Sequence, residues 1–186
     1  MLKTIKIVFF SSLLLLFTAA EAVVTPSPSA PTVIAKSYIL QDFDSGRILA
    51  ELNSDQRLPP ASITKLMTAY VVSQELHMGN IALADEVLIS EKAWRMVGSR
   101  SVIEVNTKVS VEVLLRGMII QSGNDAAVAL AEHIAGSEET FAQMMNQYAQ
   151  QLGMVDTNYR NSTGLPDPDH FTTARDIATL SAAIIR

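Results

Sequence analysis

The sequence predicts an α+β fold in which an antiparallel β-hairpin precedes a mainly helical region. Residues 37–42 and 47–52 are short apolar runs on either side of Asp44-Ser45-Gly46, a strong turn signal. After the hairpin the apolar residues recur at the spacing of helices. The 186 residues, 48% of them hydrophobic, suit one globular domain or part of a larger one.

The first 22 residues differ in composition from the rest of the chain. Lys3 and Lys6 precede an apolar stretch, and Ala20 and Ala22 stand at its end. A basic start, a short apolar segment and an Ala-x-Ala exit are typical of a secretory signal peptide, so we expect residues 1–22 to direct export and to be removed. The alternative is an uncleaved membrane anchor, although the apolar stretch is shorter than the roughly 20 residues of a spanning helix.

Residues 23–33 are rich in proline and serine and lack apolar periodicity, which predicts an extended linker. After the hairpin, Pro59-Pro60 should hold the chain out of helical geometry until a helix begins at Ser62. We expect this helix to end at Gly79-Asn80. The apolar side chains that it should bury are Ile63, Leu66, Met67, Tyr70 and Val71.

The middle of the chain predicts several more helices. Residues 86–89 are compatible with a short strand, and Ser110 can cap a helix that has Glu112 in its first turn. The expected apolar face of that helix comprises Val113, Leu114, Met118 and Ile119.

The last third of the chain predicts three helices and one long loop. An Ala-rich helix should end at Gly136, and Ser137 should cap the next helix, which runs through Leu152. Residues 153–170 are rich in Asn, Asp, Gly and Pro, and loops of this length are often functional. Thr172 then starts the last predicted helix.

The composition argues against several classes of function. The formal net charge is −5, so the chain offers neither a footprint for nucleic acid nor a basic patch for anionic lipid. The absence of cysteine excludes disulfides and thiol catalysis. His77, His133 and His170 are isolated in the sequence, so we expect surface or packed residues rather than metal ligands.

The segment "PASITKLMTAYVV" (60–72) places Ser62 and Lys65 three residues apart at the start of an apolar helix. A serine hydroxyl becomes a strong nucleophile only when a nearby base takes its proton. A lysine, with an ordinary pKa of about 10.4, can be that base if burial or the positive end of a helix lowers its pKa to about 7. The alternative interpretation is a helix-capping serine beside a surface lysine.

A second segment, "QSGND" (121–125), lies between two of the expected helices. A hydroxyl at Ser122 can pass protons between Lys65 and a leaving group, and the amide of Asn124 can donate to a substrate carbonyl and accept from a substrate N–H. Gly123 would let this turn approach another segment closely. The alternative is an ordinary Ser-Gly-Asn turn followed by a capped helix.

The two segments together carry Ser-x-x-Lys at 62–65 and Ser-x-Asn at 122–124. They resemble the motifs of the serine D-alanyl-D-alanine carboxypeptidases, the low-molecular-mass penicillin-binding proteins of the bacterial periplasm. The stretches "ILQDFDSGRILAELNSDQRLPPAS" and "NSTGLPDPDHFTTARDIATLS" are similar to this family too, so the resemblance covers about 34–186. It implies a β-lactamase/transpeptidase-like fold, with a helical subdomain beside an antiparallel sheet.

The resemblance also implies a role for each motif residue. Ser62 would be the acylated nucleophile, Lys65 the general base, Ser122 a proton relay and Asn124 a substrate-binding residue. The substrate would be the D-Ala-D-Ala end of a peptidoglycan pentapeptide, β-lactams would acylate the same serine, and no metal or organic cofactor is implied. The family further implies a periplasmic enzyme, peripheral to the inner membrane through a C-terminal anchor that this sequence lacks.

The third motif of the family, Lys-Thr/Ser-Gly, does not occur in this sequence. In the family it lies on a later strand, which supplies one oxyanion-hole N–H and binds the substrate carboxylate. We therefore expect residues 34–186 to be an incomplete penicillin-binding domain, an N-terminal fragment that holds only the first hairpin of the sheet and has little activity alone.

Two other interpretations remain open. A class A β-lactamase shares the opening motif but usually has Ser-Asp-Asn as its second motif and a deacylating glutamate in the loop that corresponds to 153–170. That loop here contains Asp156, Asp167 and Asp169 but no glutamate. A non-catalytic remnant that binds peptidoglycan or penicillin would keep the fold without the third motif.

Overall fold

The hairpin expected near the start of the chain is the first structured element of the computed structural model, which describes residues 32–186. Strand β1 (Tyr38–Gln41) pairs antiparallel with β2 (Ile48–Leu52). Inside the turn, the side chain of Asp42 accepts a hydrogen bond from the Ser45 N–H at 2.9 Å. The prediction of the hairpin is confirmed.

Helices account for most of the remaining described structure. They are the 3₁₀ turn η1 (Ala61–Ile63) and the helices α1 (Thr64–His77), α2 (Glu91–Trp94), α3 (Val111–Gln121), α4 (Asn124–Ala135), α5 (Glu138–Leu152) and α6 (Ala174–Ile185). Two predicted caps are confirmed, because the side chain of Ser110 accepts from the Val113 N–H and that of Ser137 from the Thr140 N–H. Each serine satisfies an N–H group that the first helical turn leaves free.

A second two-stranded antiparallel sheet joins β3 (Glu86–Leu88) to β4 (Lys108–Ser110). The sequence indicates the first of these strands but not the second, because β4 has only three residues and leads directly into the helix that Ser110 caps. The four-residue helix α2 is also too short to show a period. The α+β class is unchanged by this additional sheet.

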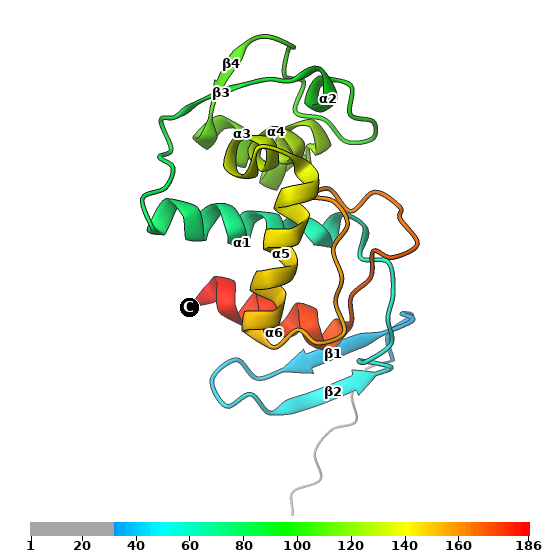
Figure 1. Ribbon diagram of the computed structural model, residues 1–186. Helices are drawn as coiled ribbons and strands as arrows, with labels where there is room; N and C mark the ends of the chain where they lie inside the picture. The colour runs from blue at the N-terminus through cyan, green and yellow to red at the C-terminus, as the bar shows by residue number, and fades with distance from the viewer. Residues whose placement is uncertain (1–31) are drawn as a thin grey trace, which may run out of the picture. The chain divides into compact units, whose positions relative to one another are not determined.

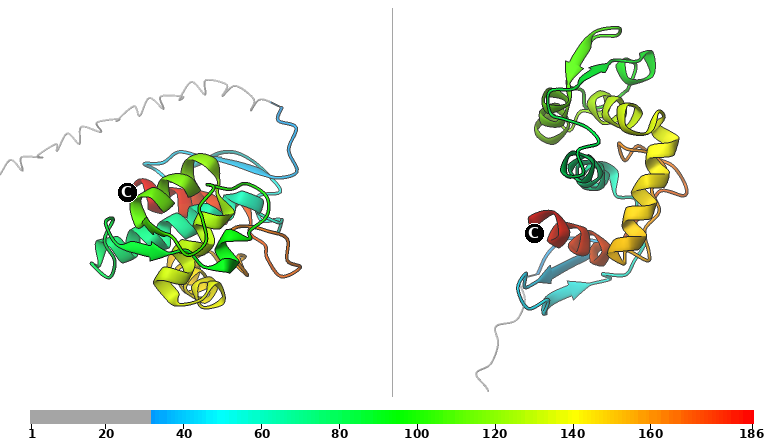
Figure 2. Two further views of the ribbon diagram at one scale, coloured as in Figure 1. Left: turned by 90° about the horizontal axis from the view of Figure 1, so that it is seen from above. Right: turned by 60° about the vertical axis from the view of Figure 1, so that its left-hand side comes forward.

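Helix α4 lies among α3, α1 and α5, and it contacts all three (Figures 1 and 2). Every residue from Asn124 to Ala131 is buried. Four of these eight are alanines, and side chains that small allow the neighbouring helices to pack closely against α4. The N-terminus of α4, where the second motif lies, is therefore held inside the protein.

Two clusters of buried apolar side chains hold the helices together, and both include residues of α1 and α4. One cluster extends to α3 and β3, for example through Met118 and Val87. The other extends to α5 and α6, through Phe141 and Leu180. Because α1 and α4 belong to both clusters, the start of each helix is fixed relative to the other.

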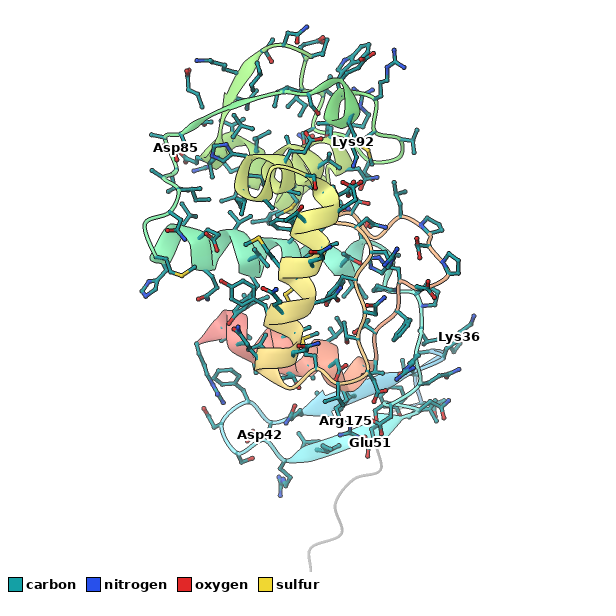
Figure 3. The ribbon with its side chains drawn as sticks, viewed as in Figure 1. Lys36, Asp42, Glu51, Asp85, Lys92 and Arg175 are labelled. Atoms are coloured by element: carbon teal, nitrogen blue, oxygen red, sulfur yellow. The ribbon has the colours of Figure 1, made fainter. Side chains whose placement is uncertain are left out.

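Helix α6 lies against the hairpin (Figure 1), which as an isolated pair of strands would be marginally stable in water. Arg175 of α6 connects the two elements, since its guanidinium pairs with Glu51 of β2 at 2.8 Å and with Asp55 at 2.6 Å (Figure 3). Leu40 and Leu49 of the hairpin are nevertheless exposed.

Four apolar side chains that we expected to be buried are exposed. They are Ile63, Leu66, Val113 and Ile119. At these positions the helix surface has no neighbouring element of the described structure packed against it. The set of buried side chains is therefore smaller than the set of apolar side chains in the sequence. Of the other expected core residues, Tyr70 is half-buried and the rest, such as Met67 and Leu114, are fully buried.

The predicted signal peptide (1–22) lies outside the described residues, as does all of the predicted linker (23–33) except its last two residues. Within 32–186, no helix is both long enough and apolar enough to cross a bilayer.

Replacing Phe141 by alanine tests the packing of the second cluster. Phe141 is fully buried, so we expect its loss to lower the free energy of unfolding of the intact protein by about 3–5 kcal/mol. The control Val155→Ala, at a position that is 81% exposed, should change it by less than about 0.5 kcal/mol. Urea denaturation measures both, and equal effects would contradict this packing.

Candidate active site

Ser62 lies in the 3₁₀ turn η1, immediately before α1, and it is exposed. The expectation that Pro59-Pro60 keeps the chain out of helical geometry is wrong for Pro60, whose φ of −75° and ψ of −15° are helical. The break comes one residue later, because Ala61 has a φ of +47°. A non-glycine residue in the left-handed region is strained, and such residues cluster at functional sites.

The strained Ala61 is packed directly against the turn at 161–164. A Cβ placed on Gly164, which has a φ of +85°, would lie 1.8 Å from the carbonyl oxygen of Ala61. Only glycine therefore allows this turn to lie so close to the start of α1. The contact joins Ser62 to a loop about 100 residues further along the chain.

Lys65, in the first turn of α1, is only 7% exposed. Its Nζ donates to the Asn124 Oδ1 at 2.7 Å and to the Thr163 carbonyl oxygen at 2.8 Å, and it lies 3.5 Å from the Ser62 Oγ. All three partners are uncharged. Among the described residues no carboxylate lies within 4.0 Å of this nitrogen, and burial lowers the pKa of Lys65.

The geometry contradicts one of the two interpretations of the first motif. Lys65 is buried and not a surface residue, and Ser62 makes no capping hydrogen bond to the helix. The alternative of a capping serine beside a surface lysine is therefore wrong.

Asn124 is held from two sides at the start of α4. Its backbone N–H donates to the Ser99 carbonyl at 2.8 Å and its Nδ2 donates to the Val97 carbonyl at 2.7 Å, while its Oδ1 accepts from Lys65. The N-cap residue of α4 is Gly123, which has no side chain to cap the helix, so the Asn124 side chain is used for contacts with Lys65 and Val97 instead. One N–H of the Asn124 amide remains for a ligand.

Ser122 ends α3 in the left-handed conformation, with a φ of 56°. In the described part of the chain its hydroxyl makes no hydrogen bond to Ser62, Lys65 or Asn124, so direct side-chain contacts link three of the four predicted residues. The expected close approach at Gly123 is confirmed, since a Cβ there would lie 2.0 Å from the Ser101 Oγ.

The contact between Lys65 and the Thr163 carbonyl is not predicted by the sequence, and it comes from a turn within the loop 153–170. Asn161 organises it, because its Oδ1 accepts from the Thr163 N–H at 3.2 Å and from the Gly164 N–H at 2.7 Å. An Asn followed by Ser, Thr and Gly is a turn signal that could have located this segment. No side-chain pattern could have shown that its carbonyl faces Lys65.

His170 has a structural role at the same place. It is buried, its Nδ1 accepts from the Arg160 N–H at 3.2 Å, and its Nε2 therefore donates to the Thr64 Oγ1 at 2.8 Å. Burial lowers the pKa of His170. His77 and His133 are exposed, so the expectation of surface or packed histidines is confirmed.

Solved structures similar to this chain include penicillin-binding proteins and D-alanyl-D-alanine carboxypeptidases. Penicillin binding protein 5 from Haemophilus influenzae matches with a TM-score of 0.83 and 47% identity, over 86% of this chain and 47% of its own. The carboxypeptidase DacD from Francisella tularensis matches with a TM-score of 0.85 and 39% identity, over 89% of this chain and 40% of its own. The predicted fold is confirmed.

The model of the D-alanyl-D-alanine carboxypeptidase family, peptidase family S11, matches residues 24–186, and the chain belongs to this family. The carboxypeptidase DacA of Haemophilus influenzae is 46% identical over 189 residues, which cover 99% of this chain and 48% of that protein. DacC of Escherichia coli is 44% identical, over 94% of this chain and 45% of its own length. The chain thus spans about half the length of these relatives.

Substitution of two glycines with positive φ, Gly164 and Gly79, tests the contact between Gly164 and the Ala61 backbone. Gly164→Ala should lower the free energy of unfolding by more than about 2 kcal/mol, because the new methyl group collides with the backbone of Ala61. The matched control is Gly79→Ala, where φ is +74° but no atom lies within 4 Å of the new Cβ, and about 1 kcal/mol is expected. Thermal or urea denaturation of the intact protein compares the two. A Gly164→Ala variant no less stable than Gly79→Ala would contradict the contact.

Proposed function

We propose that the protein is a serine D,D-carboxypeptidase that removes the terminal D-alanine from peptidoglycan stem peptides through an acyl-enzyme on Ser62. One observation carries the proposal. A neutral amine has two N–H groups and one lone pair, and Lys65 has two close acceptors, at 2.7 and 2.8 Å, and the Ser62 hydroxyl at 3.5 Å. Once the lysine is uncharged, its two N–H groups would stay bonded to Asn124 and Thr163 and its lone pair would face the serine.

The lowered pKa of Lys65 supports the role of general base. Burial without a neighbouring carboxylate disfavours the charged form of the lysine and so lowers its pKa. The neutral amine would take the Ser62 proton as Oγ attacks the carbonyl carbon of the penultimate D-alanine.

The remaining steps of the proposed reaction return the proton. The tetrahedral intermediate would collapse as the C–N bond breaks, and the terminal D-alanine would leave with the proton held by Lys65, relayed by Ser122. Water would then hydrolyse the ester on Ser62, with Lys65 again taking a proton. The backbone N–H of Ser62 would donate to the oxyanion.

Asn124 would bind the substrate amide through the one N–H of its side chain that the protein leaves free. Its Oδ1 already accepts from Lys65, so it would serve chiefly as a donor to a substrate carbonyl. A β-lactam presents a similar carbonyl and would acylate Ser62 in the same way. The names of the relatives, which are carboxypeptidases and penicillin-binding proteins, support both substrates.

We also propose the domain organisation that the sequence predicts. A signal peptide (1–22) and a linker (23–33) would precede part of a penicillin-binding domain (34–186), and the protein would act in the periplasm, peripheral to the inner membrane. In the described residues β1 and β2 pair only with each other, which supports an incomplete sheet because an isolated hairpin is marginally stable. The greater length of the relatives supports it too.

A carboxypeptidase is favoured over a class A β-lactamase because the loop from 153 to 170 has no glutamate to activate a deacylating water. The carboxypeptidase and the β-lactamase assignments are separated by incubating the protein, with its complete penicillin-binding domain, with penicillin and with a pentapeptide ending in D-Ala-D-Ala. Release of D-alanine with slow turnover of penicillin is expected, and rapid penicillin hydrolysis without D-alanine release would contradict the assignment.

Mass spectrometry of the intact protein after exposure to penicillin tests the nucleophile. We expect one covalent adduct, on the peptide that contains Ser62, and none in a Ser62→Ala variant. Ser45→Ala, in the turn of the hairpin, is the matched control and should be labelled like the wild type. A correctly folded wild-type protein without an adduct would instead indicate a non-catalytic remnant.

Changing Lys65 to alanine tests the base. We expect labelling of Ser62 by fluorescent penicillin to slow by about 10²–10⁴-fold, the usual contribution of a general base. Lys108→Ala removes an exposed lysine paired with Glu86 and should leave the rate unchanged. Undiminished labelling of Lys65→Ala would rule out its role as the base.

A further inference from the structure

The Thr163 carbonyl is one of the two close acceptors that hold Lys65, yet it lies in a turn outside any helix or strand. A turn has no regular backbone hydrogen bonds to fix its position, so the side chains around it must do so. The residue before it, Ser162, is fully buried and is held by two such side chains. Thr68 of α1 donates to the Ser162 carbonyl at 2.7 Å.

Glu138, the first residue of α5, provides the other contact. Its Oε1 accepts from the Ser162 N–H at 3.1 Å and from the Ser162 Oγ at 2.9 Å. Glu138 is only 7% exposed, so water cannot readily replace it as the acceptor for these two groups. Without Glu138, Ser162 would keep only its contact with Thr68, and the Thr163 carbonyl would be less firmly positioned although Asn161 still organises the turn.

The second carboxylate oxygen of Glu138, which does not bond Ser162, pairs with a lysine. Its Oε2 pairs with Lys92 of α2 at 3.1 Å, and Lys92, labelled in Figure 3, also pairs with the neighbouring Glu139 at 2.9 Å. Glu139 is 74% exposed and makes no contact with the turn. The two glutamates thus share one lysine, but only Glu138 contacts Ser162.

We propose that Glu138 is a positioning residue for acylation: by fixing Ser162 it holds the Thr163 carbonyl against the Lys65 amine and directs the lone pair of that amine toward Ser62. This inference rests on the proposed function. Glu138 acts by holding Ser162 in place through two hydrogen bonds. Its negative charge is not required to act on Lys65.

The rate of labelling by fluorescent penicillin in the intact protein tests the inference with three variants. Glu138→Ala removes the acceptor and should slow labelling by about 10- to 100-fold, the loss expected when a reacting group is misplaced by about 1 Å. Glu138→Gln keeps a carbonyl oxygen for Ser162 and should stay within about threefold of the wild type. Glu139→Ala, which also removes a partner of Lys92, should label like the wild type.

The comparison between alanine and glutamine at position 138 separates geometry from charge, because both variants lose the ion pair with Lys92. If Glu138→Gln labels as slowly as Glu138→Ala, the charge matters and the inference is overturned. Labelling of Glu138→Ala at the wild-type rate overturns it as well. Absence of labelling in the wild-type protein would overturn the proposed function and this inference with it.

A further variant covers the case in which Glu138→Ala does not fold. Ser162→Ala keeps the N–H that donates to Glu138 but loses the hydroxyl, so only one of the two hydrogen bonds remains. Labelling should slow by several-fold while the melting temperature stays near that of the wild type. An unchanged labelling rate in this variant overturns the inference.

Discussion

The contact on which the site depends is that between the buried amine of Lys65 and two uncharged acceptors, the Asn124 side chain and the Thr163 carbonyl. Three segments far apart in the sequence meet at this one nitrogen: the start of α1, the start of α4 and the turn at 161–164. Because none of them brings a carboxylate within reach, burial acts without compensation and lowers the pKa of Lys65. A carboxylate at the same distance would have kept the lysine charged.

Such a site is costly, since a buried lysine without a counter-ion either keeps a poorly solvated charge or gives up its proton, and both destabilise the folded state. The surrounding fold offsets this cost by placing α1 and α4 in both apolar clusters. The buried acids near the site are used elsewhere. Asp125 accepts from the Ser101 N–H at 2.8 Å and Glu138 accepts from Ser162, so each carboxylate holds a backbone segment and not the lysine.

The sequence predicts features set by residues close together in the chain, such as the first motif and the helix caps. It does not predict contacts between residues that only folding brings together. Ser62 and Lys65 are three residues apart in one helical turn, and Ser110 and Ser137 cap helices within three residues, so all of these follow from spacing. The contact of Lys65 with the Thr163 carbonyl leaves no such pattern, because any residue type can supply a backbone carbonyl and the two residues lie 98 positions apart. The contact of Glu138 with Ser162 spans 24 positions and is not marked by a local pattern either. The helical period of the sequence likewise predicts that Val113 and Ile119 are buried. They are exposed, because no other element of the described structure packs against that side of α3, and the sequence of one helix does not show which neighbours it has.

The central claim is that burial without a counter-ion lowers the pKa of Lys65 in the folded protein. An NMR titration of lysine side chains in the intact protein measures this directly, with the Lys65 signal assigned by its loss in the Lys65→Ala spectrum. The account predicts that Lys65 titrates well below the ordinary lysine value of about 10.4, while exposed lysines titrate near it. A Lys65 that titrates at or above that ordinary value would contradict the account.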